Sequence, residues 1–528
     1  MNRVFTLFMI FAVVGLSTAG WLKTYGTERQ DYLEDGVHLD DGGYLLVGYT
    51  QTTAGDFDVW CLWLDENGDE VDSRTYGGPY NDKAHSIAKT DDGFIIVGET
   101  NSYGRGTPGY SNFFIIKIDG DGNLIQQIPS DGDTSVGGEY DDCLYRIGRY
   151  TEGNVFVAVG QYWVDFTDQQ QEPFLFAING ATMLGGYNVI STGYGSDEFN
   201  DVDFSGDTIF ACGDTKNYGS GIPSFSNGYL AGVNTDLYAD YFNLGFGGEN
   251  NDKFYGIKYC DGKIYLVGET ASFGVDMTDV YAVRYSPELG TEWEQTFGGI
   301  YTDVAKDVAI VGGAMFILGK TNSTGAGYDD FYLIKADTTD GTEILERTYG
   351  GTGNDWASSI LAIGDNLLLI GSSSSPEFDA EDWDGMVVEV GLDGDTVSGI
   401  AEYLPESPYI LSAFPNPFNS SVEIIVSDGR GLACQTLSNI KVYDLRGNVV
   451  YCRRGLPTSI TSNTSIDNSS ENRHLEMSPT KGDRHLEMSP TRGTFIWTPD
   501  KNISSGIYFV RAKFSDGTTL TKRIIYSK

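Results

Sequence analysis

The side chains that recur most regularly in this sequence are seven aspartates, and carboxylates are the groups from which acid–base catalysis or a hard-metal site is built. Most follow a Tyr-Gly-Gly or Phe-Gly-Gly stretch, and they are Asp31, Asp82, Asp142, Asp201, Asp252, Asp303 and Asp355. Catalysis needs one or two carboxylates in distinct environments, whereas a residue present in every repeat typically satisfies backbone donors in a turn. We therefore expect these marker aspartates to be structural, with a metal or ligand role at a single copy as the alternative.

Seven aromatic residues occupy two repeated places near the markers. Four stand two residues before a marker and three lie in the second loop of a repeat: Tyr80, Tyr140, Phe199, Tyr301, Tyr103, Tyr218 and Phe273. In a four-stranded meander both places emerge on the same face, so these side chains are predicted to share it. Aromatic rings beside carboxylates and amides suit sugar stacking or a protein partner. Packing of the rings between repeats is the alternative.

Other kinds of site have little support in the sequence. Only His38 and His85 precede residue 404, which leaves little material for a His-ligated metal or a His-based nucleophile. The Asp-Gly turn at residues 119–123 lacks the glycine and glutamate spacing of an EF-hand. No phosphate-binding loop, Cys-x-x-Cys pair or nucleophile elbow is present. We predict no catalytic residue and no cofactor, and the sequence assigns no metal ligand.

Each repeat is predicted to form four short strands. The marker aspartates are separated by 51, 60, 59, 51, 51 and 52 residues. The second repeat shows apolar runs at 84–88, 94–100, 113–118 and 124–128, with Asp-Gly turns between strands. Seven such units predict an all-β fold whose residues 20–403 form a seven-bladed β-propeller. An open solenoid is the competitor, but its coils advance in shorter steps.

The first strand of the mature chain has no repeat of its own. Residues 21–26 match a fourth strand, yet no first, second or third strand precedes them. The last repeat has only three strands, between about residues 357 and 390. We therefore predict that residues 21–26 complete the last blade and close the ring.

These repeats resemble a known group of proteins. The fourth strand ending in Thr348-Tyr349-Gly350-Gly351, the second strand ending in Val97-Gly98-Glu99-Thr100 and the third strand at residues 331–335 are similar to those of bacterial beta-propeller repeat proteins. The resemblance covers about residues 21–400. It implies a secreted propeller, and most members of the group lack an assigned activity.

The chain changes character near residue 404. Four prolines, Pro405, Pro408, Pro415 and Pro417, predict a stiff linker at 404–418. Alternating strands then predict a small immunoglobulin-like β-sandwich at 419–528. An insert at about 453–493 contains a near-duplicated segment and few apolar residues, so it is predicted to be disordered.

The C-terminal motifs carry a second resemblance. The Asn-Pro-Phe-Asn start at 416–419, the Val-Tyr-Asp hairpin at 442–444 and the Ser-Gly-x-Tyr-Phe strand at 505–509 resemble the C-terminal sorting domain of type IX secretion cargo. That domain is itself similar to the immunoglobulin-like module of flagellar hook-capping proteins. The resemblance implies the secretion machinery as a partner.

The termini and the charge indicate export. Residues 1–19 read as a signal peptide, because a basic start is followed by an apolar run and small residues. No later segment approaches the ~20 apolar residues of a membrane span. Residues 404–528 carry 15 basic and 11 acidic side chains, so the negative charge behind the formal value of −41 lies in residues 1–403. So acidic a surface repels phosphate backbones, and we therefore expect no nucleic acid partner.

Cys434 and Cys452 flank a predicted strand pair and either form a disulfide or remain free thiols.

These observations together favour an exported protein, extracellular or on the outer cell surface, whose propeller binds a glycan or a surface protein without catalysis. The alternative is a glycan-active hydrolase or lyase that uses a carboxylate pair on the propeller face. A purely structural envelope component is the third possibility.

Overall fold

The computed structural model describes residues 20–526 apart from several internal stretches. These stretches are residues 105–109, 131–139, 152–153, 166–169, 184, 190–196, 220–224, 235–239, 275–276, 379–381, 396–408, 415–419, 429–436, 445–448, 455–493, 500–502 and 515–518. The predicted signal peptide, Cys434 and nearly all of the predicted insert lie outside the described residues. Among the described residues no helix is long and apolar enough to cross a membrane.

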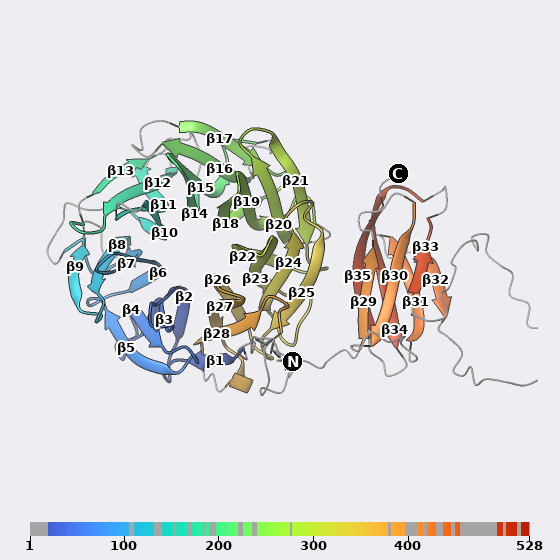
Figure 1. The fold of residues 1–528 in the computed structure, drawn as a ribbon, viewed down its shortest axis with the longest axis horizontal. Helices are drawn as coiled ribbons and strands as arrows, with labels where there is room; N and C mark the ends of the chain where they lie inside the picture. Colours follow the sequence, from blue (N-terminus) through green and yellow to red (C-terminus); the bar gives the residue numbers. More distant parts are fainter. Residues whose placement is uncertain are drawn as a thin grey trace, which may run out of the picture. The chain divides into compact units, whose positions relative to one another are not determined.

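Seven four-stranded antiparallel sheets form a ring of blades, as Figure 1 shows. The first three blades are β2 (Asp31–His38), β3 (Tyr44–Gln51), β4 (Phe57–Leu64) and β5 (Glu70–Tyr76); β6 (Asp82–Lys89), β7 (Gly93–Thr100), β8 (Asn112–Asp119) and β9 (Leu124–Ile128); and β10 (Cys143–Thr151), β11 (Val155–Asp165), β12 (Gln170–Asn179) and β13 (Gly185–Val189). Blades 4 and 5 are β14 (Glu198–Ser205), β15 (Thr208–Thr215), β16 (Asn227–Asn234) and β17 (Asp240–Phe246); and β18 (Asp252–Cys260), β19 (Lys263–Thr270), β20 (Asp279–Ser286) and β21 (Gly290–Phe297). The predicted propeller is confirmed.

The last two blades complete the ring and show how it closes. They are β22 (Asp303–Val311), β23 (Ala314–Thr321), β24 (Asp330–Asp337) and β25 (Glu343–Tyr349); and β26 (Asp355–Ile363), β27 (Asn366–Ser373), β28 (Asp384–Gly391) and β1 (Leu22–Tyr25), with a short 3-10 helix at Pro376–Phe378. The N-terminal strand β1 pairs antiparallel with β28, from Leu22 opposite Val388 to Tyr25 opposite Gly385. The predicted closing strand is therefore confirmed, and β28 is left with no open edge.

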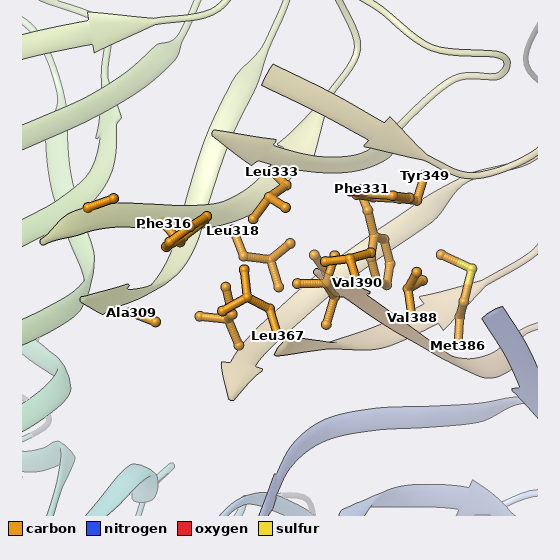
Figure 2. Packing of buried hydrophobic residues seen from close by; sticks show 14 residues of the cluster. Ala309, Phe316, Leu318, Phe331, Leu333, Tyr349, Leu367, Met386, Val388 and Val390 are labelled. Atoms are coloured by element: carbon orange, nitrogen blue, oxygen red, sulfur yellow. The ribbon is translucent and has the colours of Figure 1, made fainter. Parts of the chain in front are cut away.

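Apolar side chains fill the space between neighbouring blades. Between blades 6 and 7, Phe316, Leu333 and Leu367 are fully buried and belong to one apolar cluster with Met386 and Val388 (Figure 2). The middle strands are almost continuously apolar because both of their faces are covered by other blades. The inner strands of all seven blades surround the centre of the ring (Figure 1), so the axis is lined by the first strand of each repeat.

The C-terminal strands form a separate small β module. Its strands are β29 (Tyr409–Phe414), β30 (Val422–Asp428), β31 (Leu437–Asp444), β32 (Val449–Arg454), β33 (Thr494–Trp497), β34 (Gly506–Phe514) and β35 (Thr519–Tyr526). They make two sheets, β29-β30-β33 and β32-β31-β34-β35, with Ile424, Val442 and Trp497 in a shared core. Residues 409–414, expected to belong to the linker, form β29, because their backbone pairs antiparallel with β30, from Tyr409 opposite Asp428 to Phe414 opposite Glu423.

Candidate functional site

The marker aspartates are buried, and all but Asp201 stand at or just before the first residue of an inner strand, next to the turn from the preceding blade. The carboxylate of Asp82 accepts a hydrogen bond from the N–H of Gly78 and another from the hydroxyl of Ser102, each at 2.7 Å. The Thr100 hydroxyl donates to its other oxygen. Asp252 accepts the corresponding hydrogen bonds in its own turn. These contacts use the carboxylate within the protein, which supports a structural role.

The first glycine of the turn leaves room for two neighbouring carboxylates. A Cβ added at Gly350 would lie 2.3 Å from Oδ1 of Asp330 and 2.4 Å from Oδ2 of Asp355. Burial, followed by the charge of Asp355, raises the pKa of Asp330 to about 7. The same arrangement at Gly77 involves Asp58, whose pKa burial raises to about 6. Gly occupies this place in the motif because a side chain would strike both acids.

The aspartate in the turn before blade 4 is Asp197, and Asp201 does not occupy that place. The N–H of Asp197 donates to the carbonyl oxygen of Gln171 at 3.0 Å, and its Oδ1 accepts the N–H of Lys216 at 2.7 Å. Asp201 lies four residues later, inside β14. The weak motif copy at residues 195–201 contains both aspartates, and spacing alone selected the wrong one.

Four of the seven predicted ligand-face aromatics are involved in packing. Phe199 is fully buried, and both Phe199 and Tyr218 stack on the ring of Tyr229, with ring centroids 5.2 and 5.6 Å away. Tyr103 stacks on Phe114 at 5.6 Å, and its hydroxyl donates to a backbone carbonyl. Tyr140 packs edge-on against another tyrosine, Tyr110. Phe199 was predicted to stand two residues before the turn aspartate because Asp201 was taken for that aspartate. The turn aspartate is Asp197, so Phe199 follows it by two residues.

The remaining three of these aromatics have exposed rings. Tyr80 is 62% exposed, Tyr301 is 50% exposed and Phe273 is 41% exposed. They belong to turns of different blades, and the ring of Phe273 also packs against that of Tyr281. The seven residues therefore do not form one continuous ligand face.

A different ring of side chains surrounds the axis. In every blade the pairing of the first and second strands is interrupted by a β-bulge at the same place, two to four residues after the turn aspartate. The unpaired residue of each bulge is polar and partly buried: Glu34, His85, Tyr145, Asn200, Tyr255, Lys306 and Ser358. We call these residues the bulge ring. Bulges redirect a side chain out of the sheet pattern and are frequent beside binding sites.

The residue after each bulge forms a second, buried layer centred on Arg146. Its guanidinium donates to Asp201 at 3.1 Å and to Asp307 at 2.5 Å, and lies 3.4 Å from Asp35. Burial alone would lower the pKa of Arg146, but the three carboxylates raise it well above its ordinary value. The Ser359 hydroxyl bridges Asp35 and Asp307 at 2.9 Å to each. This cluster ties together blades 1, 3, 4, 6 and 7.

A cavity of about 620 Å³ extends from the Arg146 cluster along the later parts of all seven inner strands. Its lining includes Val37, Phe204 and Ile310 but no member of the bulge ring. On each inner strand the bulge residue precedes the residue of the Arg146 layer, and the cavity-lining residues follow. The bulge ring and the cavity therefore lie on opposite sides of the Arg146 cluster.

Aromatic side chains from blades 7 and 1 lie next to the bulge ring, where the Tyr49 hydroxyl donates a hydrogen bond to Glu34. Trp356 and Trp383 are 4.2 Å apart, Trp383 and Tyr32 are 5.5 Å apart, and Tyr32 and Tyr49 are 4.8 Å apart, measured between ring centroids. Phe57 packs edge-on against Tyr49 at 5.4 Å. Trp356 is 40% exposed. We call these five residues the aromatic arc.

Amino groups lie over two rings of the aromatic arc. Lys320 is 5.3 Å from the Trp356 ring and Lys83 is 5.3 Å from the Tyr49 ring. Rings of this kind present apolar faces with polar groups at their edges, which is the arrangement that sugar rings require.

Two members of the bulge ring have pKa values shifted toward neutral pH. Burial raises the pKa of Glu34, against the lowering effects of His85 and Lys306 and of a hydrogen bond with Ser358. Burial lowers the pKa of Lys306, although the carboxylates of Glu269 and Glu34 act in the opposite direction. The Lys306 ammonium lies 4.0 Å from the centre of the Tyr255 ring. An acid and a base shifted in this way are suited to proton transfer.

The sequence contained a signal for this site. The bulge residues stand three places after the turn aspartate, and their types differ in every blade except for the two tyrosines. The residues just before them, such as Leu33, Phe254 and Ala305, are all apolar and buried. Variation at one place within an otherwise uniform repeat marks the positions that packing does not determine.

A family model matches only the C-terminal part of the chain. Residues 412–473 match the secretion system C-terminal sorting domain. This domain directs export and surface association and implies contact with the secretion machinery. No curated protein matches the sequence.

Solved structures match parts of the chain at low sequence identity, with TM-scores under 0.5. The WD40 beta propeller domain of Doa1 is 9% identical, covers 70% of this chain and 96% of its own, and gives a TM-score of 0.41. A Pyrococcus horikoshii acylaminoacyl peptidase is 12% identical, with coverages of 76% and 59% and a TM-score of 0.38. A Trypanosoma rangeli sialidase is also 12% identical, with coverages of 62% and 57% and a TM-score of 0.35. Similarity at this level does not support a function.

Proposed function

We propose that the propeller is the binding domain of an exported, surface-associated protein and that it binds a carbohydrate at the bulge ring and the aromatic arc. The observation that carries the proposal is the placement of seven polar bulge residues beside five neighbouring aromatic rings. Sugars offer flat apolar faces for stacking and hydroxyl groups that need both donors and acceptors. The bulge ring supplies carboxylate, imidazole, phenol, amide, ammonium and hydroxyl groups within one partly buried ring.

The charge around the bulge ring and the aromatic arc differs from that of the propeller as a whole, and the difference favours this location. The propeller as a whole is strongly acidic. Lys83, Lys306 and Lys320 nevertheless gather around the bulge ring and the arc, where they lie over aromatic rings. Lys83 and Lys320 also pair with Glu99 and Asp329, so a ligand with hydroxyl groups meets both donors and acceptors here.

A glycan array that includes neutral and acidic saccharides, probed with the full exported chain, tests the proposal. We expect selective binding, and we expect Trp356→Ala to weaken it at least about fivefold, since stacking contributes about 1 kcal/mol or more per ring. Tyr241→Ala is the control, because Tyr241 is an aromatic on the outer strand β17 that is 56% exposed, compared with 40% for Trp356. Absence of binding by the folded wild type, or an equal loss in both variants, would contradict the proposal.

A second candidate function, cleavage of the bound glycan, is favoured by Glu34 and Lys306. Their shifted pKa values and their place in the bulge ring suit an acid–base pair. If the protein is an enzyme, incubation with the saccharide found on the array will generate new reducing or unsaturated ends. Glu34→Gln should then abolish turnover while retaining binding. Saturable binding without any product would show that the propeller is a binding module.

A further inference from the structure

Three side chains from blades 2 and 3 come together beside the bulge ring. They are His85 on β6, Glu99 on β7 and Cys143 on β10, and one ligand atom from each lies within 4.8 Å of the other two. His85 and Glu99 are half-buried, and Cys143 is 3% exposed. In the described part of the chain this is the one group of three or more histidine, cysteine and acidic side chains with such spacing.

The fold holds these three residues in place independently of one another. His85 is the unpaired residue of its bulge, so its side chain is directed away from the regular ladder. Glu99 lies opposite Lys83 in the ladder and accepts a hydrogen bond from its amino group at 3.0 Å. Cys143 begins β10, opposite Gln161. The ring of Tyr145 packs 5.9 Å from that of His85 and limits its rotation.

The donor set identifies the class of metal. An imidazole nitrogen, a thiolate sulfur and a carboxylate oxygen together are the ligands of borderline divalent cations such as Zn²⁺, whereas Ca²⁺ and Mg²⁺ take oxygen ligands. Bonds of about 2.0–2.3 Å bring ligand atoms closer together than the 4.8 Å limit within which these three lie, and small side-chain rotations allow that approach. Three protein ligands leave the fourth tetrahedral position for water or for a group of a ligand.

We propose that His85, Glu99 and Cys143 bind a borderline divalent metal ion of the Zn²⁺ type, with one coordination position left open. Binding replaces the S–H bond of Cys143 by a metal–sulfur bond and releases one proton to solvent. The two negative ligands then balance the charge of the ion. The amino group of Lys83 remains as a hydrogen-bond donor to Glu99 outside the coordination shell. This site does not depend on the proposed carbohydrate binding.

Titration of the metal-free full chain with Co²⁺ alone tests the inference. We expect one equivalent to produce a thiolate-to-cobalt charge-transfer band, and we expect added Zn²⁺ to remove it by displacement. Cys143→Ser and His85→Ala should each lose the band. Cys212→Ser is the matched control, because Cys212 is another fully buried propeller thiol outside the cluster. It should retain both the band and its stoichiometry.

Other cysteines provide an internal check on the source of the band. The chain has six cysteines, so a band that persists in Cys143→Ser would come from another thiol and would overturn the proposal. Absence of any band in the wild type would overturn it as well. If Cys143→Ser does not fold, Glu99→Gln offers a second variant, which should weaken Co²⁺ binding while the circular dichroism spectrum stays unchanged. An unaltered affinity in that folded variant would also contradict the site.

Discussion

Arg146 is the residue on which the centre of the propeller depends. It is a single cation among three buried carboxylates that come from three different blades. Each carboxylate also accepts backbone N–H groups, such as that of Ile257 on Asp201. These bonds satisfy the acids but leave their charge to be balanced by the guanidinium.

Replacement of Arg146 by Met should therefore destabilise the propeller strongly. We expect a loss of about 3–5 kcal/mol in the free energy of unfolding, because three buried carboxylates would lose their cation. Arg149→Met is the control, since Arg149 is exposed and pairs with Asp91 at the surface; that change should cost less than about 1 kcal/mol. Denaturant titration of both variants measures the difference. Equal effects would show that the axial ion pairs add little.

At the scale of the strand, two features shape the propeller: the bulge in each inner strand and the closing strand β1. A bulge at the same place in all seven inner strands turns one polar side chain per blade toward the axis region without disturbing the apolar residues beside it. The strand β1 closes the ring by pairing with β28, which would otherwise have an unpaired edge.

Removal of residues 20–26 should open the ring at blade 7. We expect the truncated chain to unfold at a temperature several degrees lower and to aggregate more readily, because the N–H and C=O groups of β28 lose their partner strand. A synthetic peptide with the sequence of residues 20–26, added in excess, should restore part of the lost stability. A scrambled peptide serves as the control. Unchanged thermal unfolding after truncation would show that β1 is dispensable.

At the scale of the molecule, the propeller contains many buried acids within a strongly acidic chain. Burial raises the pKa of Asp58 to about 6 and that of Asp330 to about 7, from an ordinary value of 3.8. Between the ordinary and the raised values the folded state binds more protons than the unfolded chain. Stability therefore falls as the pH rises through about 4 to 7. Repulsion among the surplus negative charges acts in the same direction.

The propeller should accordingly be more stable at pH 5 than at pH 8. We expect a difference of at least about 1 kcal/mol in the free energy of unfolding, since one pKa unit corresponds to about 1.4 kcal/mol. Asp330→Asn should raise the unfolding temperature at pH 8 and reduce the difference between the two pH values. Calorimetry at both pH values, with the variant alongside, measures this. A maximum of stability at pH 8 would contradict the argument.

Much of the fold was predictable from the sequence because each repeat carries its own local information. The Gly-Gly turn, the Asp-Gly hairpins and the period near 51 residues predicted seven blades, and the unpaired strand at residues 21–26 predicted ring closure. These features depend on turn chemistry and on strand alternation, which act over a few residues.

The tertiary structure alone decided which side chains meet. Spacing could not distinguish Asp197 from Asp201, because both lie in one weak repeat copy, and this four-residue error placed the buried Phe199 on a predicted ligand face. The axial cluster joins Asp35, Arg146 and Asp307, which are far apart in the chain and become neighbours only when the ring closes. The sequence by itself determined the blades and their order. The bulge ring, the aromatic arc and the Arg146 cluster arise where different blades converge on the axis, and local sequence patterns do not encode contacts between repeats.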